Sequence, residues 1–175
     1  EHISLQLARA LQWVWQHAGE HGGDARRIVV VGHSAGAHLA AMLLSCRWKQ
    51  LNDALPAQLV SGAMAISGVY DLEPLRHTPF LQASLRLTPE QVRMASPALL
   101  PAPFVGEGRG VLVSVAGGDE SDEFLRHNQL IQQDWGDEAV PVCEALPSLN
   151  HFSVLDALVN PKHHLHKLAM LLLGQ

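Results

Sequence analysis

A serine stands between two glycines in the segment Gly32-His33-Ser34-Ala35-Gly36. A β-branched run precedes this G-x-S-x-G pentapeptide and a helical pattern follows it, which is the strand-turn-helix setting of a nucleophile elbow. We therefore predict that Ser34 is the nucleophile of a serine hydrolase. Gly32 and Gly36 are expected to prevent side-chain clashes with the adjoining strand and helix. A glycine-rich phosphate loop is disfavoured because the sequence has neither a Walker lysine nor a G-x-G-x-x-G pattern.

Ala35 follows the serine at the start of the predicted helix. At this end of a helix the dipole and the free backbone N–H groups favour negative charge. The Ala35 N–H is therefore predicted to donate a hydrogen bond to an oxyanion that forms on the substrate. Two histidines flank the motif, His33 and His38, and we interpret both as packing groups rather than as catalysts that titrate.

A serine hydroxyl becomes nucleophilic when a base removes its proton and a carboxylate orients that base. In hydrolases with this elbow the chain order is serine, acid, histidine, and the histidine lies after the last strand. The sequence contains 11 histidines, and we predict His151 as the base because it directly follows the last strand-like run. The final predicted helix carries His163, His164 and His166, which we interpret as a solvated face rather than a metal site. The remaining histidines, including His127, are interpreted as surface residues.

Candidate acids gather after the third predicted strand, where Asp119, Glu120, Asp122 and Glu123 lie within five residues. Their position alone does not separate them. Some of these carboxylates are expected to be first-turn charges of the following helix. Asp71, which follows the preceding predicted strand, is a further candidate for the acid.

The elements that position these residues alternate between strand and helix patterns, which predicts an α/β fold with a parallel sheet and helices on both faces. The run from Ile28 to Val31 is typical of a strand that is buried on both faces. The expected strands comprise residues 28–31, 59–69, 110–116 and 140–146, and the expected helices residues 3–18, 35–46, 121–135 and 163–173.

Prolines break this regularity between residues 71 and 103, which predicts a helical insertion. One of its short helices is expected to begin with the capping box of residues 88–91. Because no linker or low-complexity segment divides the chain, we expect a single domain that spans residues 1–175.

Composition narrows the classes of protein further. The chain has 175 residues, of which 47% are hydrophobic, and its 12 basic and 17 acidic residues give a net charge of -5. Without a cluster of Lys and Arg, a nucleic-acid partner is excluded. No apolar run reaches the roughly 18 residues of a membrane span. Cys46 and Cys143 are expected to be buried free thiols. A leader peptide would lie before Glu1 and outside this sequence, and we expect a cytoplasmic protein.

The segment from Gly32 to Ala41, which reads GHSAGAHLAA, resembles the elbow of the kynurenine formamidase (arylformamidase) group of α/β-hydrolases. Three other segments resemble the same group: residues 67–72 after the next strand, residues 120–124 in the acid loop, and His151-Phe152 in the histidine loop. The resemblance covers about residues 20–160. Related bacterial carboxylesterases share most of these segments.

This resemblance implies that Glu120 is the catalytic acid, with its neighbour Asp119 as the first alternative. It further implies hydrolysis of N-formylkynurenine to kynurenine and formate, a step of tryptophan catabolism that needs no metal and no organic cofactor. Two other functions remain open: a general carboxylesterase for short-chain esters, and a non-catalytic fragment or interaction module. The implied partners are a small-molecule ester or formamide and, through an unpaired sheet edge, a second copy in a homodimer.

One motif of the formamidase group, a His-Gly-Gly-x oxyanion segment after an early strand, has no counterpart in this chain. The similar segment His21-Gly22-Gly23 lies in a helix-to-strand loop, where it is expected to stop a helix. The resemblance therefore implies an α/β-hydrolase fold, of which this chain is the C-terminal two-thirds with the N-terminal strands missing.

Overall fold

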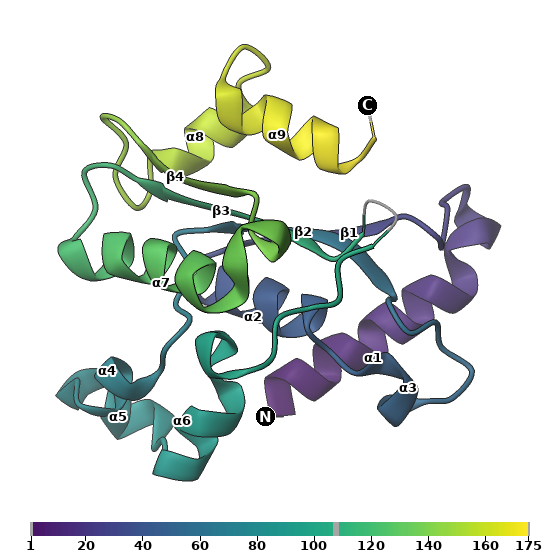
Figure 1. Ribbon diagram of the computed structural model, residues 1–175, viewed down its shortest axis with the longest axis horizontal. Helices are drawn as coiled ribbons and strands as arrows, with labels where there is room; N and C mark the ends of the chain where they lie inside the picture. Colours follow the sequence, from purple (N-terminus) through teal and green to yellow (C-terminus); the bar gives the residue numbers. More distant parts are fainter. Residues whose placement is uncertain (1, 107–108, 175) are drawn as a thin grey trace.

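The computed structural model describes residues 2–106 and 109–174. Within these residues the sheet consists of β1 (Ile28–His33), β2 (Val60–Ile66), β3 (Val111–Gly117) and β4 (Val142–Leu146). The strand order is β1-β2-β3-β4 and all three pairings are parallel. Figure 1 shows the sheet with its helices. The predicted parallel α/β architecture is confirmed.

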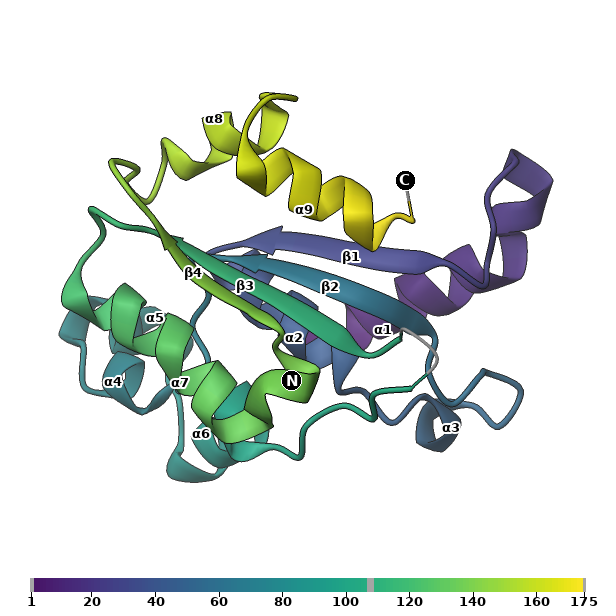
Figure 2. The ribbon, with the colours of Figure 1, turned by 45° about the horizontal axis from the view of Figure 1, so that its top comes forward.

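Helices cover both faces of this sheet. The principal helices are α1 (His2–His17), α2 (Ala35–Leu44), α7 (Asp122–Ala139), α8 (Val154–Val159) and α9 (His164–Leu172). Figure 2 shows α8 and α9 on one face and α2 and α7 on the other. Leu165 and Leu168 of α9 pack with Met64 and Val113 of the sheet, while Ile131 of α7 belongs to a second buried cluster on the opposite face. Burial of these apolar side chains holds the layers together.

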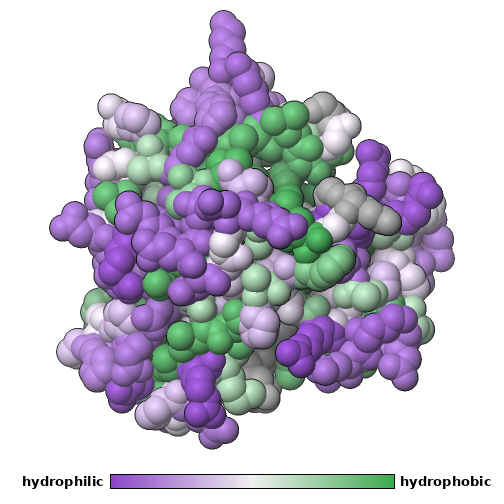
Figure 3. All heavy atoms as spheres, viewed as in Figure 1, coloured by the Kyte–Doolittle hydropathy of each residue, from purple (hydrophilic) through white to green (hydrophobic). Residues whose placement is uncertain are grey.

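Strand β1 lies at one edge of the sheet and pairs only with β2 among the described residues. Val30 packs against the core on the α2 side, so Val31 points to the opposite face, where it is 51% exposed. The expectation that this strand is buried on both faces is therefore wrong. The reason is that α9 packs on β2 and leaves the adjoining face of β1 open. Figure 3 shows apolar side chains gathered between α9 and β1.

The segment between β2 and β3 contains α4 (Glu73–Arg76), α5 (Pro79–Leu85), α6 (Pro89–Ala95) and the 3₁₀ turn η2 (Pro97–Leu99). At the start of α6 the Thr88 hydroxyl accepts from the Gln91 N–H at 3.2 Å, and the Gln91 side chain accepts from the Thr88 N–H at 2.9 Å. This confirms the predicted capping box.

Two side chains from the helix layer attach this segment to the fold. His38 of α2 donates through Nε2 to the carbonyl of Ala95 at 2.7 Å. Trp135 of α7 donates through Nε1 to the carbonyl of Pro97 at 3.0 Å. These contacts place the segment beside α2 and α7. That it is an insertion into a single domain stays a prediction.

Between α1 and β1 the chain forms the 3₁₀ turn η1 (Ala18–His21), which ends at Gly22 in the left-handed conformation, with φ 78°. The Gly23 N–H donates to the Ala18 carbonyl at 2.8 Å. The segment His21-Gly22-Gly23 therefore ends a helix, as predicted, before the amino end of β1.

A short helix, α3 (Trp48–Leu51), follows the last turn of α2. Cys46 and Cys143 are free and half-buried rather than fully buried, and burial raises the pKa of the Cys46 thiol to about 11.

No helix within residues 2–106 and 109–174 is long and apolar enough to cross a membrane.

Candidate active site

Ser34 occupies a strained turn between β1 and α2. Its backbone has φ 55° and ψ −117°, a region that residues with a side chain seldom adopt. The turn is held by the neighbouring strand, because the Ser34 N–H donates to the Ile66 carbonyl at 2.9 Å. A serine on such a strand-turn-helix junction has the backbone geometry of a nucleophile elbow.

The two glycines of the motif differ in what they do. A Cβ at Gly32 would overlap the backbone carbonyl of Gly36 and would lie 2.7 Å from the Ala37 nitrogen. A Cβ at Gly36 would meet nothing within 4 Å. The expectation that both glycines prevent clashes is therefore correct for Gly32 and wrong for Gly36. The difference arises because the first turn of α2 lies directly against Gly32, whereas a Cβ on Gly36 would point into open space.

Glu120 and His151 meet at the carboxyl end of the sheet. Glu120 follows β3 and His151 lies in the loop between β4 and α8. Oε2 of Glu120 lies 2.7 Å from Nδ1 of His151. The Glu120 side chain is fully buried, whereas the His151 side chain is 23% exposed. Because Ser34 follows β1 and parallel strands share their carboxyl edge, all three predicted residues come from the same edge of the sheet.

The other oxygen of the Glu120 carboxylate is also occupied. Oε1 accepts hydrogen bonds from the Ser67 hydroxyl at 2.5 Å and from the Gly117 N–H at 2.6 Å. In the sequence, Ser67 stands out only as part of the segment 67–72 that resembles the formamidase group. Its position directly after β2, at the same sheet edge, is a signal that could have placed it beside the acid.

The alternative acids lie elsewhere. Asp119 is exposed, its backbone N–H donates to the carbonyl of Leu149 at 2.9 Å, and its side chain has no hydrogen bond to another described residue. One oxygen of Asp71 accepts from the Glu73 N–H at 2.9 Å, and the other lies 4.0 Å from Arg126. Among the described residues, Glu120 is the carboxylate that contacts His151.

Aromatic rings surround the His151 side chain. The rings of His33 and Phe124 each lie 4.5 Å from that of His151, between centroids, and Phe152 stands edge-on at 5.4 Å. His33 also donates through Nε2 to the His151 carbonyl at 2.7 Å. His38, whose pKa is lowered by burial, bonds the carbonyl of Ala95 instead. The interpretation of both as packing groups agrees with these contacts.

His127 is buried, with 1% of its surface exposed, so the interpretation of it as a surface residue is wrong. Its Nδ1 accepts from the Tyr70 N–H at 3.1 Å, and its Nε2 lies 3.2 Å from Glu123 without the geometry of a hydrogen bond. Burial lowers the pKa of His127, and the charge of Arg126 lowers it further. The Tyr70 contact ties the chain after β2 to α7.

The histidines of the last helix have separate partners. His163 caps α9 by accepting from the Leu165 N–H at 3.1 Å, and His166 contacts the Leu158 carbonyl at 2.9 Å. His164 lies 3.0 Å from the carboxylate of Glu144. Within the described part of the chain no three His, Cys, Asp or Glu residues are placed to hold a metal ion.

The backbone around Ser34 also presents a hydrogen-bond donor. Ala35 is the first residue of α2 and is exposed. The first amides of an α-helix have no acceptor within the helix, so the Ala35 N–H is available to a ligand. His21-Gly22-Gly23 precedes the amino end of β1, whereas Ser34 follows its carboxyl end. A six-residue strand separates them by roughly 20 Å, so that segment does not contact Ser34.

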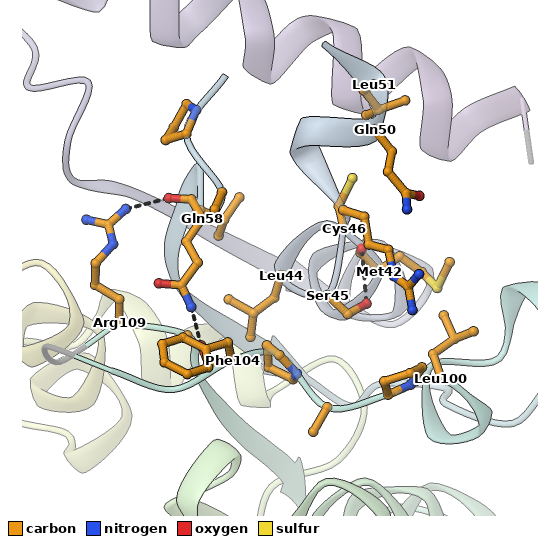
Figure 4. A pocket seen from close by; sticks show the side chains of 18 of the residues that line it. Met42, Leu44, Ser45, Cys46, Gln50, Leu51, Gln58, Leu100, Phe104 and Arg109 are labelled. Atoms are coloured by element: carbon orange, nitrogen blue, oxygen red, sulfur yellow. Dashed lines mark hydrogen bonds between the residues drawn. The ribbon is translucent and has the colours of Figure 1, made fainter. Parts of the chain in front are cut away.

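A large hollow lies at the opposite end of the sheet. Its volume is about 1440 Å³, and its lining includes Met42, Cys46, Gln58, Phe104 and Arg109 (Figure 4). Arg109 donates to the Gln58 carbonyl at 2.8 Å, and the Gln58 side chain donates to the Phe104 carbonyl. The side chains of Arg109 and Gln58 thus bond to the walls of the hollow, and its lining includes none of the predicted catalytic residues.

Comparison with known proteins identifies the family of the chain. Residues 5–120 match a family described by its alpha/beta hydrolase fold. The chain belongs to this alpha/beta hydrolase family. Two solved structures share its fold. An esterase of Pyrobaculum calidifontis superposes with a TM-score of 0.66 at 16% identity, over 95% of this chain and 59% of that chain. The acetyl ester-xyloside bifunctional hydrolase of Caldicellulosiruptor lactoaceticus superposes with a TM-score of 0.64 at 18% identity, over 98% of this chain and 63% of that chain.

Curated relatives of this alpha/beta hydrolase include two fish kynurenine formamidases. The protein of Salmo salar is 31% identical and that of Danio rerio 33% identical, each over 151 residues that make up 85% of this chain. Esterase LipQ of Mycobacterium tuberculosis is 38% identical over 71 residues, which are 39% of this chain and 17% of that protein. The hydrolase chain spans about half the length of the two formamidases.

Proposed function

We propose that the protein is a serine hydrolase that cleaves an N-formyl aromatic amide, with N-formylkynurenine as substrate and kynurenine and formate as products. The observation that carries the catalytic part of this proposal is the 2.7 Å contact between the buried Glu120 and His151, at the sheet edge where Ser34 occupies its strained turn. The choice of substrate is supported by the similarity to kynurenine formamidases over 85% of the chain.

In the proposed mechanism the Ser34 hydroxyl attacks the formyl carbon while His151 removes its proton. Because a carboxylate only accepts, the His151 Nδ1 donates to Glu120, and this leaves the Nε2 lone pair free to act as the base. The Ala35 N–H stabilises the oxyanion. The histidine then gives the proton to the leaving aniline nitrogen, the C–N bond breaks, and kynurenine departs from a formyl-enzyme.

Water completes the cycle. His151 deprotonates a water molecule that attacks the formyl-enzyme, the bond to the serine oxygen breaks, and that oxygen recovers the proton as formate leaves. The aromatic part of the substrate is proposed to stack near Phe152, whose ring is 78% exposed and adjoins His151.

A general carboxylesterase is the second candidate, because the same triad cleaves esters and the solved proteins that share the fold include an esterase. The test compares the turnover of N-formylkynurenine with that of p-nitrophenyl acetate, with Ser34→Ala as the control. Turnover of the formamide that is lost in the Ser34→Ala variant supports the proposal. Turnover of the ester alone contradicts the formamidase assignment and supports the esterase.

A non-catalytic fragment is the third candidate, since the chain spans half the length of the formamidases and only one oxyanion donor is assigned. Loss of one such donor costs about 10²- to 10³-fold in related chemistry. A serine-reactive phosphonate probe that labels wild type but not Ser34→Ala would contradict this candidate. Absence of labelling, together with no turnover of either substrate, would support it.

A further inference from the structure

Ser67 has a backbone conformation that its side chain does not favour. It is the residue directly after β2, it is 1% exposed, and its φ is 54°. Glycine adopts such a backbone without steric cost, whereas serine is strained there. The Ser67 N–H donates to the Val115 carbonyl at 2.7 Å, and this bond continues the pairing of β2 with β3.

The strained backbone directs the Ser67 hydroxyl at the buried acid. The hydroxyl oxygen lies 2.5 Å from Oε1 of Glu120, and the Gly117 N–H lies 2.6 Å from the same atom. An ionised carboxylate only accepts hydrogen bonds, so the hydroxyl must donate. Two donors on Oε1 hold the plane of the carboxylate, and Oε2 then faces Nδ1 of His151 at 2.7 Å.

The three contacts also make burial of the carboxylate possible. The Glu120 side chain has no exposed surface, and a charge without water is stable only where hydrogen bonds replace its hydration. Gly117 contributes a backbone N–H, which every side-chain substitution except proline retains. Of the two donors to Oε1, Ser67 is therefore the one whose hydrogen bond comes from a side chain.

We propose that Ser67 is a positioning residue that fixes the orientation of Glu120 toward His151. This proposal rests on the proposed function, because it assigns Glu120 and His151 to the catalytic triad. Ser67 acts through Glu120, so its loss is expected to weaken the chemical step and to leave substrate binding largely unchanged.

Two substitutions separate this role from a structural one. Ser67→Ala removes the hydroxyl and retains the backbone strain, whereas Ser67→Gly removes the hydroxyl and relieves the strain. Ser61→Ala is the matched control, because the Ser61 hydroxyl lies on the same strand and donates to the Ile28 carbonyl at 2.9 Å, away from Glu120.

The first measurement needs no substrate: the low-field proton NMR signal of the His151 Nδ1–H in the folded chain. We expect both Ser67 variants to shift or broaden this signal and Ser61→Ala to leave it unchanged. The thermal midpoint of Ser67→Gly is expected to equal or exceed that of Ser67→Ala. If folded Ser67→Gly retains the wild-type signal, the proposal is wrong.

The second measurement is steady-state hydrolysis of the substrate that the chain turns over. We expect both Ser67 variants to lower kcat about 10- to 100-fold, the effect of one hydrogen bond to a charged group, with KM changed less than about twofold. An unchanged kcat in both variants would overturn the role of Ser67. A failure of the proposed triad itself is recognised separately: in that case Glu120→Gln would leave the low-field proton NMR signal of the His151 Nδ1–H unchanged.

Discussion

The ring of His33, the residue before the proposed nucleophile, donates through Nε2 to the backbone carbonyl of His151 at 2.7 Å. The two rings also lie 4.5 Å apart. Residues separated by more than a hundred positions thus attach the elbow directly to the histidine loop. The residue between Gly32 and Ser34 in the motif therefore links the nucleophile segment to the base segment.

Substitution of His33 is predicted to affect catalysis more than stability. His33→Ala removes the bond to the His151 loop, and a hydrogen bond of about 1 kcal/mol corresponds to a loss of about fivefold to tenfold in kcat. His33→Gln keeps an N–H donor and is expected to recover part of that loss. The experiment measures kcat for the substrate that the wild type hydrolyses, and the thermal midpoint of unfolding, in the wild type and in both variants. A lower midpoint with an unchanged kcat would show that the bond is only structural.

Glu120→Gln is predicted to abolish most of the activity. The amide of glutamine donates to Nδ1 of His151 and so stabilises the imidazole tautomer that carries its proton on Nε2, where it cannot act as the base. In a serine protease the corresponding change lowers kcat about 10⁴-fold. Asp119→Asn is the control, since Asp119 is exposed and contacts only the Leu149 carbonyl through its backbone. Equal losses in the two variants would contradict the assignment of Glu120.

Ser34 and His151 can be predicted as the nucleophile and the base from the sequence because their signals are local. A strand run and a helical run flank the serine, and the histidine follows the last strand run. Glu120 and Asp119 are adjacent in one loop, and no local pattern separates them. The contact that distinguishes Glu120 comes from His151, which lies 31 residues later, so the residues of the loop alone leave the choice open and only the family resemblance favours Glu120.

The errors of the sequence analysis have the same origin. His127 lies in a helix of mixed polarity, and it is buried at a contact with Tyr70, 57 residues earlier in the chain, whose N–H donates to it. Val31 lies in a run that looks fully buried, but its exposure depends on which elements cover β1. Gly36 matches the motif as well as Gly32 does, and only the path of α2 distinguishes the space beside them.

The two motif glycines are predicted to respond oppositely to alanine. Gly32→Ala places a methyl group into the backbone at Gly36 and Ala37, and the overlap is expected to cost about 2–4 kcal/mol of unfolding free energy. Gly36→Ala meets open space within α2, and alanine favours a helix by about 0.5–1 kcal/mol over glycine. Urea unfolding measures both. Destabilisation of Gly36→Ala by more than about 1 kcal/mol would contradict this prediction.

Stability is predicted to fall as the pH decreases below about 7, because His127 is buried and its pKa is lowered. Above the ordinary histidine pKa of about 6.5, both the folded and the unfolded chain keep it neutral. As the pH falls through that value the unfolded chain binds a proton more readily than the folded chain, so the free energy of unfolding decreases as the pH falls. His38, whose pKa is also lowered by burial, adds a loss of the same sign.

His127→Gln tests the origin of this pH dependence. The glutamine carbonyl can accept from the Tyr70 N–H and does not titrate. We expect the thermal midpoint of this variant to fall less between pH 7.5 and pH 5.5 than that of the wild type, while Glu123, Arg126 and Asp71 still surround the site. His21→Gln is the control, because His21 is exposed and has no ion pair among the described residues; this variant is expected to retain the wild-type pH dependence. Equal pH dependence in wild type and His127→Gln would exclude His127 as the source.

The open edge of β1 is predicted to make the 175-residue chain associate with itself when it is expressed alone. Val31 is 51% exposed there, and β1 has one pairing partner among the described residues. Exposed strand edges with apolar side chains pair readily, and a charged residue on the edge opposes pairing. Val31→Lys is therefore expected to shift the chain toward monomer in sedimentation velocity, with less than about 0.5 kcal/mol change in stability.

Phe80→Lys is the matched control, because Phe80 is 74% exposed on α5 and lies outside the sheet. Association that only Phe80→Lys abolishes would place the contact on the helical segment instead of the strand edge.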